Sequence, residues 1–314
     1  MKFCLLILVF FLFIVNDYSQ ETLMTRGLGN YGGNCNCRQL EMVESYPVKQ
    51  LIKEKTVRFD LSGLLLYNGN ILAIADKEWD RFIYKITENE NGFDYLPFFS
   101  FCTKINLDIE GIDYCNNIFY LIDEFNNCVY QIINGTCELK EFELPWEKYG
   151  IDRTGWGNRG FEGIAIDSVN KIMYLAKERE PRRIFSINMQ TLEISEPFIP
   201  QLDTGGGHDI AELKFENGYL YILERGLGQI TRIDVKTKEK VAVSYQAYVY
   251  KNGMRWFKND TPQFGMAEAF VFIGDEIWLG IDNNGNQVSE FGKTFGLQDG
   301  SNTAIIVFKR PEGF

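Results

Sequence analysis

Apolar and polar positions alternate along this chain in a pattern that returns five times. Each copy starts with a short motif, continues as a strand with every second residue apolar, turns, and runs back as a second apolar strand that ends at a charged residue. The equivalent motif positions are Ser62, Glu110, Glu162, Ala211 and Glu268. The charged residues after the second strands are Asp76, Asp123, Glu178, Glu224 and Asp282. A period of roughly 50 residues is that of a four-stranded blade, so the pattern predicts an all-β fold, a β-propeller of four-stranded antiparallel blades.

Further strand patterns extend these pairs to full blades and bear on the number of blades. Phe82–Thr87 and Phe93–Phe101 have the pattern of outer strands of the first blade. After the fifth pair, Thr303–Lys309 has the pattern of one more strand. We expect it to belong to a sixth blade that Val48–Phe59 helps to complete, because a joint between the chain ends leaves no open sheet edge. The prediction is a six-bladed propeller, with five blades as the alternative.

The N-terminus has the pattern of an export signal. Met1 and Lys2 precede an unbroken apolar run from Phe3 to Val15, which is too short to span a bilayer. An uncleaved anchor is the alternative. We expect residues 1–20 to be a signal peptide, 21–47 an N-terminal extension and 48–314 the propeller domain. The mature protein would then have no transmembrane segment and would be secreted or periplasmic.

The charge of the chain limits its partners. The formal net charge is -11 at pH 7, which argues against a nucleic-acid partner because phosphate backbones require clustered Lys and Arg. The same charge is compatible with metal cations, and solubility alone would also account for it. We expect a monomer whose partner is a small anionic substrate or a surface ligand.

The cysteines predict disulfide bonds. Those that follow the signal are Cys35, Cys37, Cys102, Cys115, Cys128 and Cys137. An even number in an exported chain favours disulfides over a metal site, and no CxxC spacing supports zinc. In a blade, the loops after the second and fourth strands lie on one face and the turns after the first and third on the other. This argument predicts the pairs Cys102–Cys128 and Cys115–Cys137, with Cys35 and Cys37 joined to each other or free.

Several stretches also resemble a known family. They are LSGLLL, IEGIDY, GFEGIAID, KEREPRRIF, HDIAEL, YILERG and PQFGMAEAFVF, spread over about residues 55 to 310. They resemble the phytase-like family known as "esterase-like activity of phytase" and are similar to the related SdiA-regulated propellers. The resemblance implies a propeller fold and, more weakly, ester or phosphoester hydrolysis. Ser62 and Ala211 depart from the pattern, because neither supplies a carboxylate at the leading position.

The acidic motif residues predict a metal site. The first strand of each blade lines the central channel, so Glu110, Glu162 and Glu268 should meet near one mouth, with Asp209 or Glu212 joining them. Several confined carboxylates do not all stay ionised without a cation. Ligands that are all oxygen atoms suit Ca²⁺. We therefore predict Ca²⁺ at this mouth; the alternative is that each glutamate caps backbone amides and stabilises blade packing.

Basic residues next to these acids are candidates for catalysis. Arg179, Arg182 and Arg225 could face the same mouth and hold an anionic group through bidentate contacts. Ion pairing with neighbouring glutamates is the alternative. His208, the single histidine, precedes the fourth motif and is a candidate general base, or else a loop histidine with a structural role.

Together these features suggest a function and its alternatives. The chain lacks an Arg-His-Gly motif, a Gly-x-Ser-x-Gly motif and a dinucleotide fingerprint. The leading hypothesis is a secreted, calcium-dependent hydrolase of a phosphoester or ester, in which the metal activates water. The alternative is a non-catalytic propeller that binds a ligand or protein and uses calcium structurally; a lactonase is a further alternative.

Overall fold

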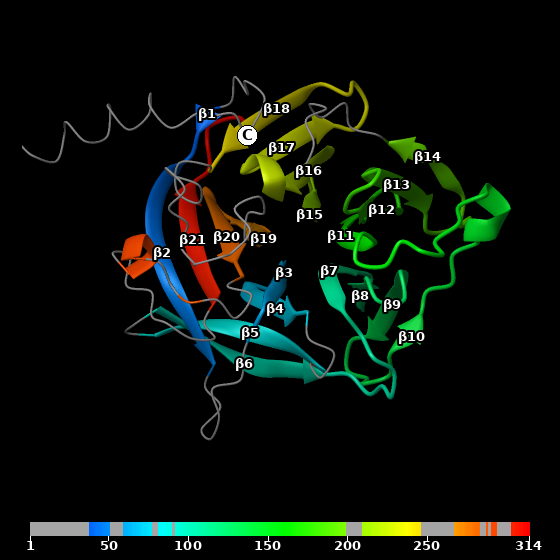
Figure 1. The fold of residues 1–314 in the computed structure, drawn as a ribbon, viewed down its shortest axis with the longest axis horizontal. Helices are drawn as coiled ribbons and strands as arrows, with labels where there is room; N and C mark the ends of the chain where they lie inside the picture. The colour runs from blue at the N-terminus through cyan, green and yellow to red at the C-terminus, as the bar shows by residue number, and fades with distance from the viewer. Residues whose placement is uncertain are drawn as a thin grey trace, which may run out of the picture. The chain divides into compact units, whose positions relative to one another are not determined.

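The computed structural model describes residues 38–50, 59–76, 81–89, 92–198, 209–245, 267–282, 287, 290–293 and 303–314. The chain divides into two units, Met1–Cys35 and Asn36–Phe314, and all described residues belong to the second. Their strands form small antiparallel sheets arranged about a common centre (Figure 1). The described part contains no helix that is long and apolar enough to span a bilayer.

The strands group into five four-stranded blades. Blade 1 contains β3 (Leu61–Tyr67), β4 (Asn70–Ala75), β5 (Phe82–Asn89) and β6 (Gly92–Ser100). Blade 2 contains β7 (Ile109–Cys115), β8 (Ile118–Asp123), β9 (Cys128–Ile133) and β10 (Lys140–Glu141). Blade 3 contains β11 (Phe161–Asp167), β12 (Ile172–Lys177), β13 (Arg183–Asn188) and β14 (Ile194–Phe198). Blade 4 contains β15 (Ile210–Glu216), β16 (Tyr219–Glu224), β17 (Gln229–Asp234) and β18 (Lys240–Ser244). Blade 5 contains β19 (Ala267–Ile273), β20 (Glu276–Ile281), β21 (Thr303–Lys309) and β2 (Glu41–Gln50).

The other described elements are short. The strand β1 (Arg38–Gln39) runs parallel to β18 at the outer edge of blade 4. Two 3-10 helices and one α-helical turn complete the list: η1 (Trp146–Tyr149), η2 (Arg225–Leu227) and α3 (Glu290–Lys293). Because η2 directly follows β16, it belongs to the loop that joins the second and third strands of blade 4.

The prediction of six blades is wrong, and the C-terminal strand explains why. β21 pairs antiparallel with β20, so it is the third strand of the fifth blade and does not start a sixth. β2 then pairs antiparallel with β21 as the fourth strand. The expected joint between the two ends of the chain is therefore present within blade 5. Of Val48–Phe59, the first three residues lie in β2, while residues 51–58 lie outside the described residues. The strands of the second unit begin at Arg38, inside the stretch expected to be an extension.

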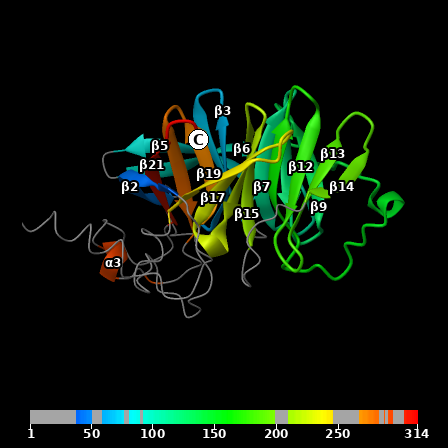
Figure 2. The same cartoon turned by 90° about the horizontal axis from the view of Figure 1, so that it is seen from above.

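The five first strands enclose the channel. β3 contacts β7, β7 contacts β11, and the series continues through β15 and β19 back to β3. Figure 1 shows these strands nearest the centre, and Figure 2 shows several of them standing side by side after a 90° turn. Since the ring closes with five strands, corresponding residues of different blades face each other across a narrow space.

Each first strand carries a β-bulge at the same place. The register shifts fall at Leu61/Gly63, Ile109/Gly111, Phe161/Gly163, Ile210/Glu212 and Ala267/Ala269. The bulged residues are therefore Ser62, Glu110, Glu162, Ala211 and Glu268, the five motif positions expected from the sequence. A bulge redirects the side chain that it carries, which explains why the repeat keeps its leading residue out of the regular alternation.

Glycine follows the bulge where neighbouring first strands come closest. A Cβ atom at Gly163 would lie 2.8 Å from the Leu213 nitrogen, and one at Gly111 would lie 3.0 Å from the Glu162 carbonyl oxygen. Both distances are to backbone atoms, which cannot move away by a change of rotamer as a side chain can. Glycine at these positions lets β7, β11 and β15 pack side by side around the channel.

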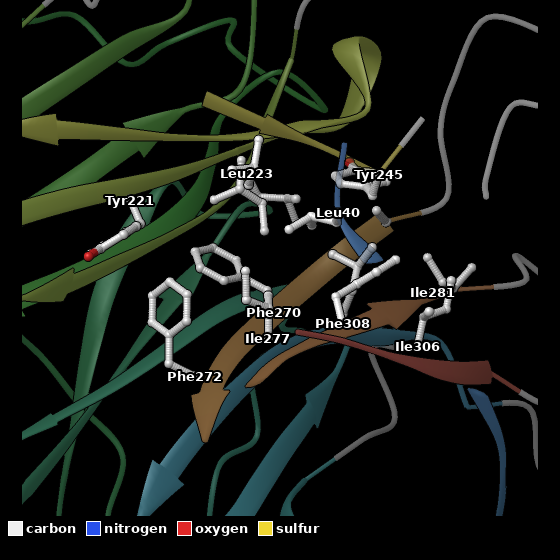
Figure 3. Packing of buried hydrophobic residues seen from close by; sticks show 14 of the residues in the cluster. Leu40, Tyr221, Leu223, Tyr245, Phe270, Phe272, Ile277, Ile281, Ile306 and Phe308 are labelled. Atoms are coloured by element: carbon white, nitrogen blue, oxygen red, sulfur yellow. The ribbon is translucent and has the colours of Figure 1, made fainter. Parts of the chain in front are cut away.

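Apolar side chains fill the space between blades. In Figure 3, Tyr221 and Leu223 of blade 4 face Phe270 and Phe308 of blade 5 in one buried cluster. Leu40, between β1 and β2, is 2% exposed and belongs to the same cluster. The N-terminal segment is therefore held by apolar packing as well as by strand pairing.

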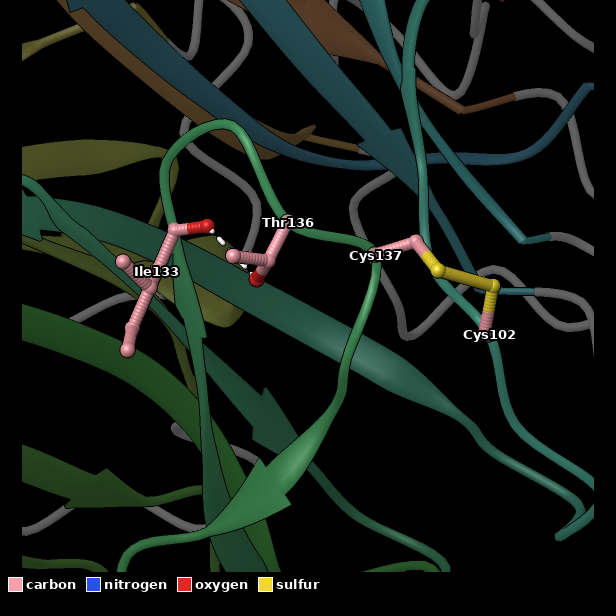
Figure 4. The surroundings of a disulfide bond; sticks show 4 residues. All are labelled: Cys102, Ile133, Thr136 and Cys137. Atoms are coloured by element: carbon pink, nitrogen blue, oxygen red, sulfur yellow. Dashed lines mark hydrogen bonds between the residues drawn. A yellow bond between two sulfur atoms is a disulfide. The ribbon is translucent and has the colours of Figure 1, made fainter.

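The structure contains one disulfide among the described residues, and both predicted pairs are wrong. Cys102 is bonded to Cys137, with their Cα atoms 5.2 Å apart (Figure 4). Cys115 and Cys128 are free and buried. The connection from blade 1 runs along the outer edge of blade 2, where the Cys102 amide donates to the Cys137 carbonyl at 2.6 Å. The prediction placed Cys137 on a face turn, whereas it lies beyond that turn. Cys35 and Cys37 lie outside the described residues.

Candidate metal centre

Two sets of equivalent residues surround one mouth of the channel. The first set is the bulged residues. The second set consists of the residue that directly follows the second strand of each blade. In blades 2 and 4, for example, the register pairs Ile109 with Asp123 and Ile210 with Glu224, the last residues of those strands. The set is therefore Asp76, Glu124, Glu178, Arg225 and Asp282. Asp123 and Glu224, chosen from the sequence, are therefore each one residue too early.

Three of these residues form a compact acidic group. Carboxylate oxygens of Glu124, Glu162 and Glu178 all lie within 4.8 Å of one another. The three residues are 2%, 6% and 1% exposed. Glu162 comes from the bulge of β11, while Glu124 and Glu178 follow β8 and β12. The group is thus built from blades 2 and 3 at their shared end, and we call it the buried acidic group.

Backbone contacts hold the buried acidic group in place. The Gly160 amide donates to Glu124 Oε1 at 2.8 Å, and the Glu178 amide donates to the Gly160 carbonyl at 2.7 Å. A Cβ atom at Gly160 would lie 1.8 Å from Oδ1 of Asn127. That same Oδ1 accepts the Phe161 amide at 3.2 Å. A larger residue at position 160 would therefore have to displace the Asn127 side chain where the chain enters β11.

The two oxygens of Glu178 differ in their surroundings. Oε1 accepts from Arg225 Nη2 at 2.5 Å and also pairs with Arg179. Oε2 is buried and has no hydrogen-bond partner among the described residues. A buried carboxylate oxygen without a partner is costly in free energy. Within the described part of the protein, this atom is the clearest candidate ligand for a bound cation.

Burial makes the charged form of this group unfavourable. It raises the pKa of Glu124 to about 8, a rise to which the charges of Glu178 and Asp108 add. It likewise raises the pKa of Glu178 to about 7, although Arg225 and Arg179 oppose that shift. The pKa of Glu162 is well above its usual range, through burial and then the charges of Glu110 and Glu178. Near neutral pH the group therefore needs protons or a cation.

A second acidic group lies beside the first and is more open. Carboxylate oxygens of Asp76, Asp108 and Glu110 lie within 4.8 Å of one another, and all three residues are half-buried. Burial, followed by the charges of Asp76 and Asp108, holds the pKa of Glu110 well above its usual range. The charge of Glu124 acts in the same direction, which shows that the two groups are neighbours.

On the other side of the mouth, Arg225 is surrounded by acids. Its Nε donates to Asp209 Oδ2 at 2.8 Å, its Nη2 to Glu178 Oε1 at 2.5 Å and its Nη1 to Glu268 Oε1 at 2.5 Å. Burial alone would lower the pKa of Arg225, but these carboxylates outweigh it and hold the pKa well above its usual value. The cation is therefore a fixed part of blade 4.

The three glutamates expected to share one metal thus meet at the mouth in three settings. Glu162 belongs to the buried acidic group, Glu110 to the open one, and Glu268 pairs with Arg225. The other members of the two acidic groups were not among the predicted metal ligands: Glu124, Glu178, Asp76 and Asp108. The step of 14 residues from Ser62 to Asp76, which recurs from Glu268 to Asp282, leads from Glu110 to Glu124 and could have identified Glu124.

Glu212 lies within the channel in a different role. It follows the bulge, at the position that glycine takes in three other blades. Its Oε1 accepts the Leu64 amide at 3.3 Å and pairs with Lys214, while Oε2 accepts the Phe270 amide. Its side chain therefore joins blade 4 to blades 1 and 5. These contacts favour the structural alternative for this residue.

The predicted catalytic arginines are all ion-paired. Arg179 pairs with Glu178 and donates to the Asn158 carbonyl at 2.7 Å. Arg182 Nη1 lies 3.2 Å from Glu224 Oε1. These contacts match the ion-pairing alternative. His208 lies outside the described residues.

The fold and the site define a class: a five-bladed β-propeller with acidic residues at one channel mouth. Residues 55–259 match the SdiA-regulated family, and since this is more than half of the chain, the protein belongs to that family. The expected similarity to SdiA-regulated propellers is confirmed, whereas the phytase-like name is not.

Two solved structures are similar to this chain. A glutaminyl cyclase from Myxococcus xanthus is 11% identical with a TM-score of 0.53, over 88% of this chain and 98% of that one. A structural genomics protein of unknown function from Bacteroides thetaiotaomicron is also 11% identical, with a TM-score of 0.46, over 84% of this chain and 75% of that one. At such identities, the likeness to the cyclase concerns the fold alone.

Proposed function

We propose that this protein is a calcium-binding propeller whose ion is held by Glu124, Glu162 and Glu178. The observation that carries the proposal is the approach of three buried carboxylates to within 4.8 Å of one another. Glu178 Oε2, buried and without a hydrogen-bond partner among the described residues, supports it. Both acidic groups offer oxygen ligands alone, which Ca²⁺ prefers over thiolate or imidazole.

The proposed ion would also bind the ligand. Ca²⁺ takes six to eight oxygen atoms, more than three carboxylates supply in most geometries. Water or the oxygens of an anionic ligand would complete its coordination. The arginines expected to hold such a ligand are ion-paired with Glu178, Glu224, Asp209 and Glu268, so the metal becomes the main attraction for an anion.

Calorimetric titration tests the metal site. Chelator-treated protein is titrated with CaCl₂ and with MgCl₂, alongside the variants Glu162→Gln and Glu193→Gln. Glu193 is exposed on the outer part of blade 3 and serves as a control of equal charge change. We expect calcium to bind and Glu162→Gln to weaken it by more than the roughly 10–100-fold that loss of an outer-shell partner costs. Folded native protein that binds no calcium would refute the proposal.

A second candidate function is calcium-dependent ester hydrolysis. Glu110 lies next to the buried acidic group without belonging to it, and burial and neighbouring acids hold its pKa well above its usual range. A carboxylate in this position could accept a proton from water bound to the metal. The candidate thus assigns Glu110 as the general base and leaves binding of the metal to its neighbours.

A substrate panel distinguishes this candidate from a binding protein. Phosphomonoesters, carboxylic esters and lactones are incubated with purified protein, with calcium and again with chelator. The hydrolase predicts turnover that requires calcium and falls at least roughly 100-fold in Glu110→Gln, while calorimetry still detects calcium binding. Calcium-bound protein without turnover on any of these substrates would leave a non-catalytic binding propeller with structural calcium.

Export is part of the proposal. The disulfide between Cys102 and Cys137 supports an oxidising compartment, as does the signal pattern of residues 1–20. N-terminal sequencing of protein collected from the medium or periplasm should begin near residue 21. Recovery of the chain only from the cytosol with Met1 intact would contradict export.

A further inference from the structure

Arg225 occupies a position that the four other blades give to an acidic residue. The strand register places it in the set that also contains Asp76, Glu124, Glu178 and Asp282. At the bulge of the same blade stands Ala211, so blade 4 contributes no carboxylate from its motif position. The repeat is thus altered at both positions of one blade, from acids to one cation and one small apolar residue.

The surroundings of Arg225 resemble those of a bound metal ion. Its three nitrogens contact three different carboxylates, from Asp209, Glu178 and Glu268, at 2.8, 2.5 and 2.5 Å. The side chains of Arg225, Asp209 and Glu178 are 11%, 1% and 1% exposed. These acids come from blades 4, 3 and 5. A positive charge at this point therefore joins three blades, as a divalent cation with carboxylate ligands would.

We infer that Arg225 is a built-in counterion that takes the place of a second divalent cation between Asp209, Glu178 and Glu268. It would confine exchangeable cations to the side of the mouth formed by blades 1 to 3. This inference rests on the proposed function, because it assumes that the buried acidic group binds calcium.

Glu178 connects the two sides of the mouth. Its Oε1 contacts Arg225, whereas its Oε2 is buried and has no hydrogen-bond partner among the described residues, and we propose that Oε2 is a calcium ligand. One carboxylate would thus bridge the fixed cation and the exchangeable one. Removal of Arg225 should therefore change both the number of cations bound and the affinity of the native site.

The test is the number of cations bound per chain. Equilibrium dialysis against CaCl₂ compares the native protein with Arg225→Gln, Arg225→Lys and Lys236→Gln. Lys236 is exposed in the turn between β17 and β18, and its replacement removes one positive charge from the same blade. We expect Arg225→Gln to bind one more calcium ion than the native protein. Arg225→Lys and Lys236→Gln should keep the native number.

A second measurement covers the case in which Arg225→Gln does not fold without metal. The Tm is then measured by thermal unfolding at rising CaCl₂ concentrations. It should increase more for Arg225→Gln than for the native protein, because calcium binding at a second site adds to the stability. The double variant Arg225→Gln/Glu268→Gln leaves only two acids, so it should bind the native number of ions.

The outcomes separate the two proposals. Native protein that binds no calcium would refute the proposed function. Native protein that binds calcium, with an unchanged number of ions and an unchanged Tm response in Arg225→Gln, would overturn the role of Arg225 alone. An equal increase in the number of bound calcium ions in Arg225→Gln and in the double variant would also overturn the role of Arg225.

Discussion

Buried carboxylates lie on both sides of the channel mouth, but the charges around them differ between the two sides. On the side of blades 4 and 5, Asp209 and Glu268 are neutralised by Arg225, a cation supplied by the chain. On the side of blades 1 to 3, six carboxylates gather in two groups within the same repeat geometry. On the first side the chain supplies the counterion; on the second, arginine side chains reach Glu178, and we propose that a calcium ion completes the neutralisation. The difference comes from the two equivalent positions of blade 4, which carry Ala211 and Arg225.

The largest expected effect is the loss of the fixed cation. Arg225→Met should lower the free energy of unfolding by about 3–5 kcal/mol in the presence of chelator, because it leaves buried carboxylates uncompensated. Urea titration measures the change. Lys236→Met, a charge loss on the exposed turn of the same blade, should stay within about 0.5 kcal/mol. Equal effects of Arg225→Met and Lys236→Met would contradict the role of Arg225 as a buried counterion.

The next effect concerns the backbone beside the buried acidic group. Gly160→Ala should lower the free energy of unfolding by about 1–3 kcal/mol, because its Cβ would lie 1.8 Å from Asn127 Oδ1. The displaced Gly160 amide should also weaken calcium binding. In Asn127→Ala, adding Gly160→Ala should cost clearly less than it does in the native protein. A cost unchanged by Asn127→Ala would contradict this account.

A smaller effect of opposite sign is expected within the buried acidic group. Glu162→Gln should raise the free energy of unfolding by about 1 kcal/mol at pH 8 in chelator, because it removes one of three buried acids that repel each other. In saturating calcium the same variant should be less stable than the native protein. Thermal unfolding under both conditions measures the reversal. A variant destabilised equally in both would indicate that Glu162 serves packing alone.

A further expected effect is a dependence on pH. The folded-state pKa of Glu124 is about 8 and that of Glu178 about 7, both above the unfolded value of a glutamate. Without metal, their contribution to stability is therefore complete below about pH 4.5 and is lost as pH rises to about 8. Urea titrations in chelator across this range should show the fall. Calcium should flatten it, because the ion binds the ionised form.

Much of the fold followed from local pattern. The five motif residues all lie in β-bulges on the first strands, because the repeat in sequence reflects a repeat in backbone geometry. The number of blades did not follow from local pattern. Thr303–Lys309 would show the same pattern of apolar residues in the third strand of blade 5 and in a strand of a sixth blade. The choice depends on the pairing of β21 with β20, a contact between distant residues.

The candidate site was predicted in part for the same reason. The sequence indicated that acids gather at one mouth, but side-chain partners depend on the strand register. A shift of one residue separates Asp123 from Glu124, and only the second belongs to the buried acidic group. Sequence proximity likewise could not show that Arg225 pairs with Glu268, 43 residues away. The disulfide was mispredicted because the path of a loop along a blade edge has no periodic signal.

The strand β2 has a consequence for how the protein is made. This strand comes from the beginning of the described chain, yet its antiparallel partner is β21, at the end. β2 can pair in parallel with β6, which is synthesised soon after it, but its antiparallel pairing with β21 must wait until the strands of the other blades have been made. The ring therefore closes only after β21 has been synthesised, which makes closure a late and non-local folding step.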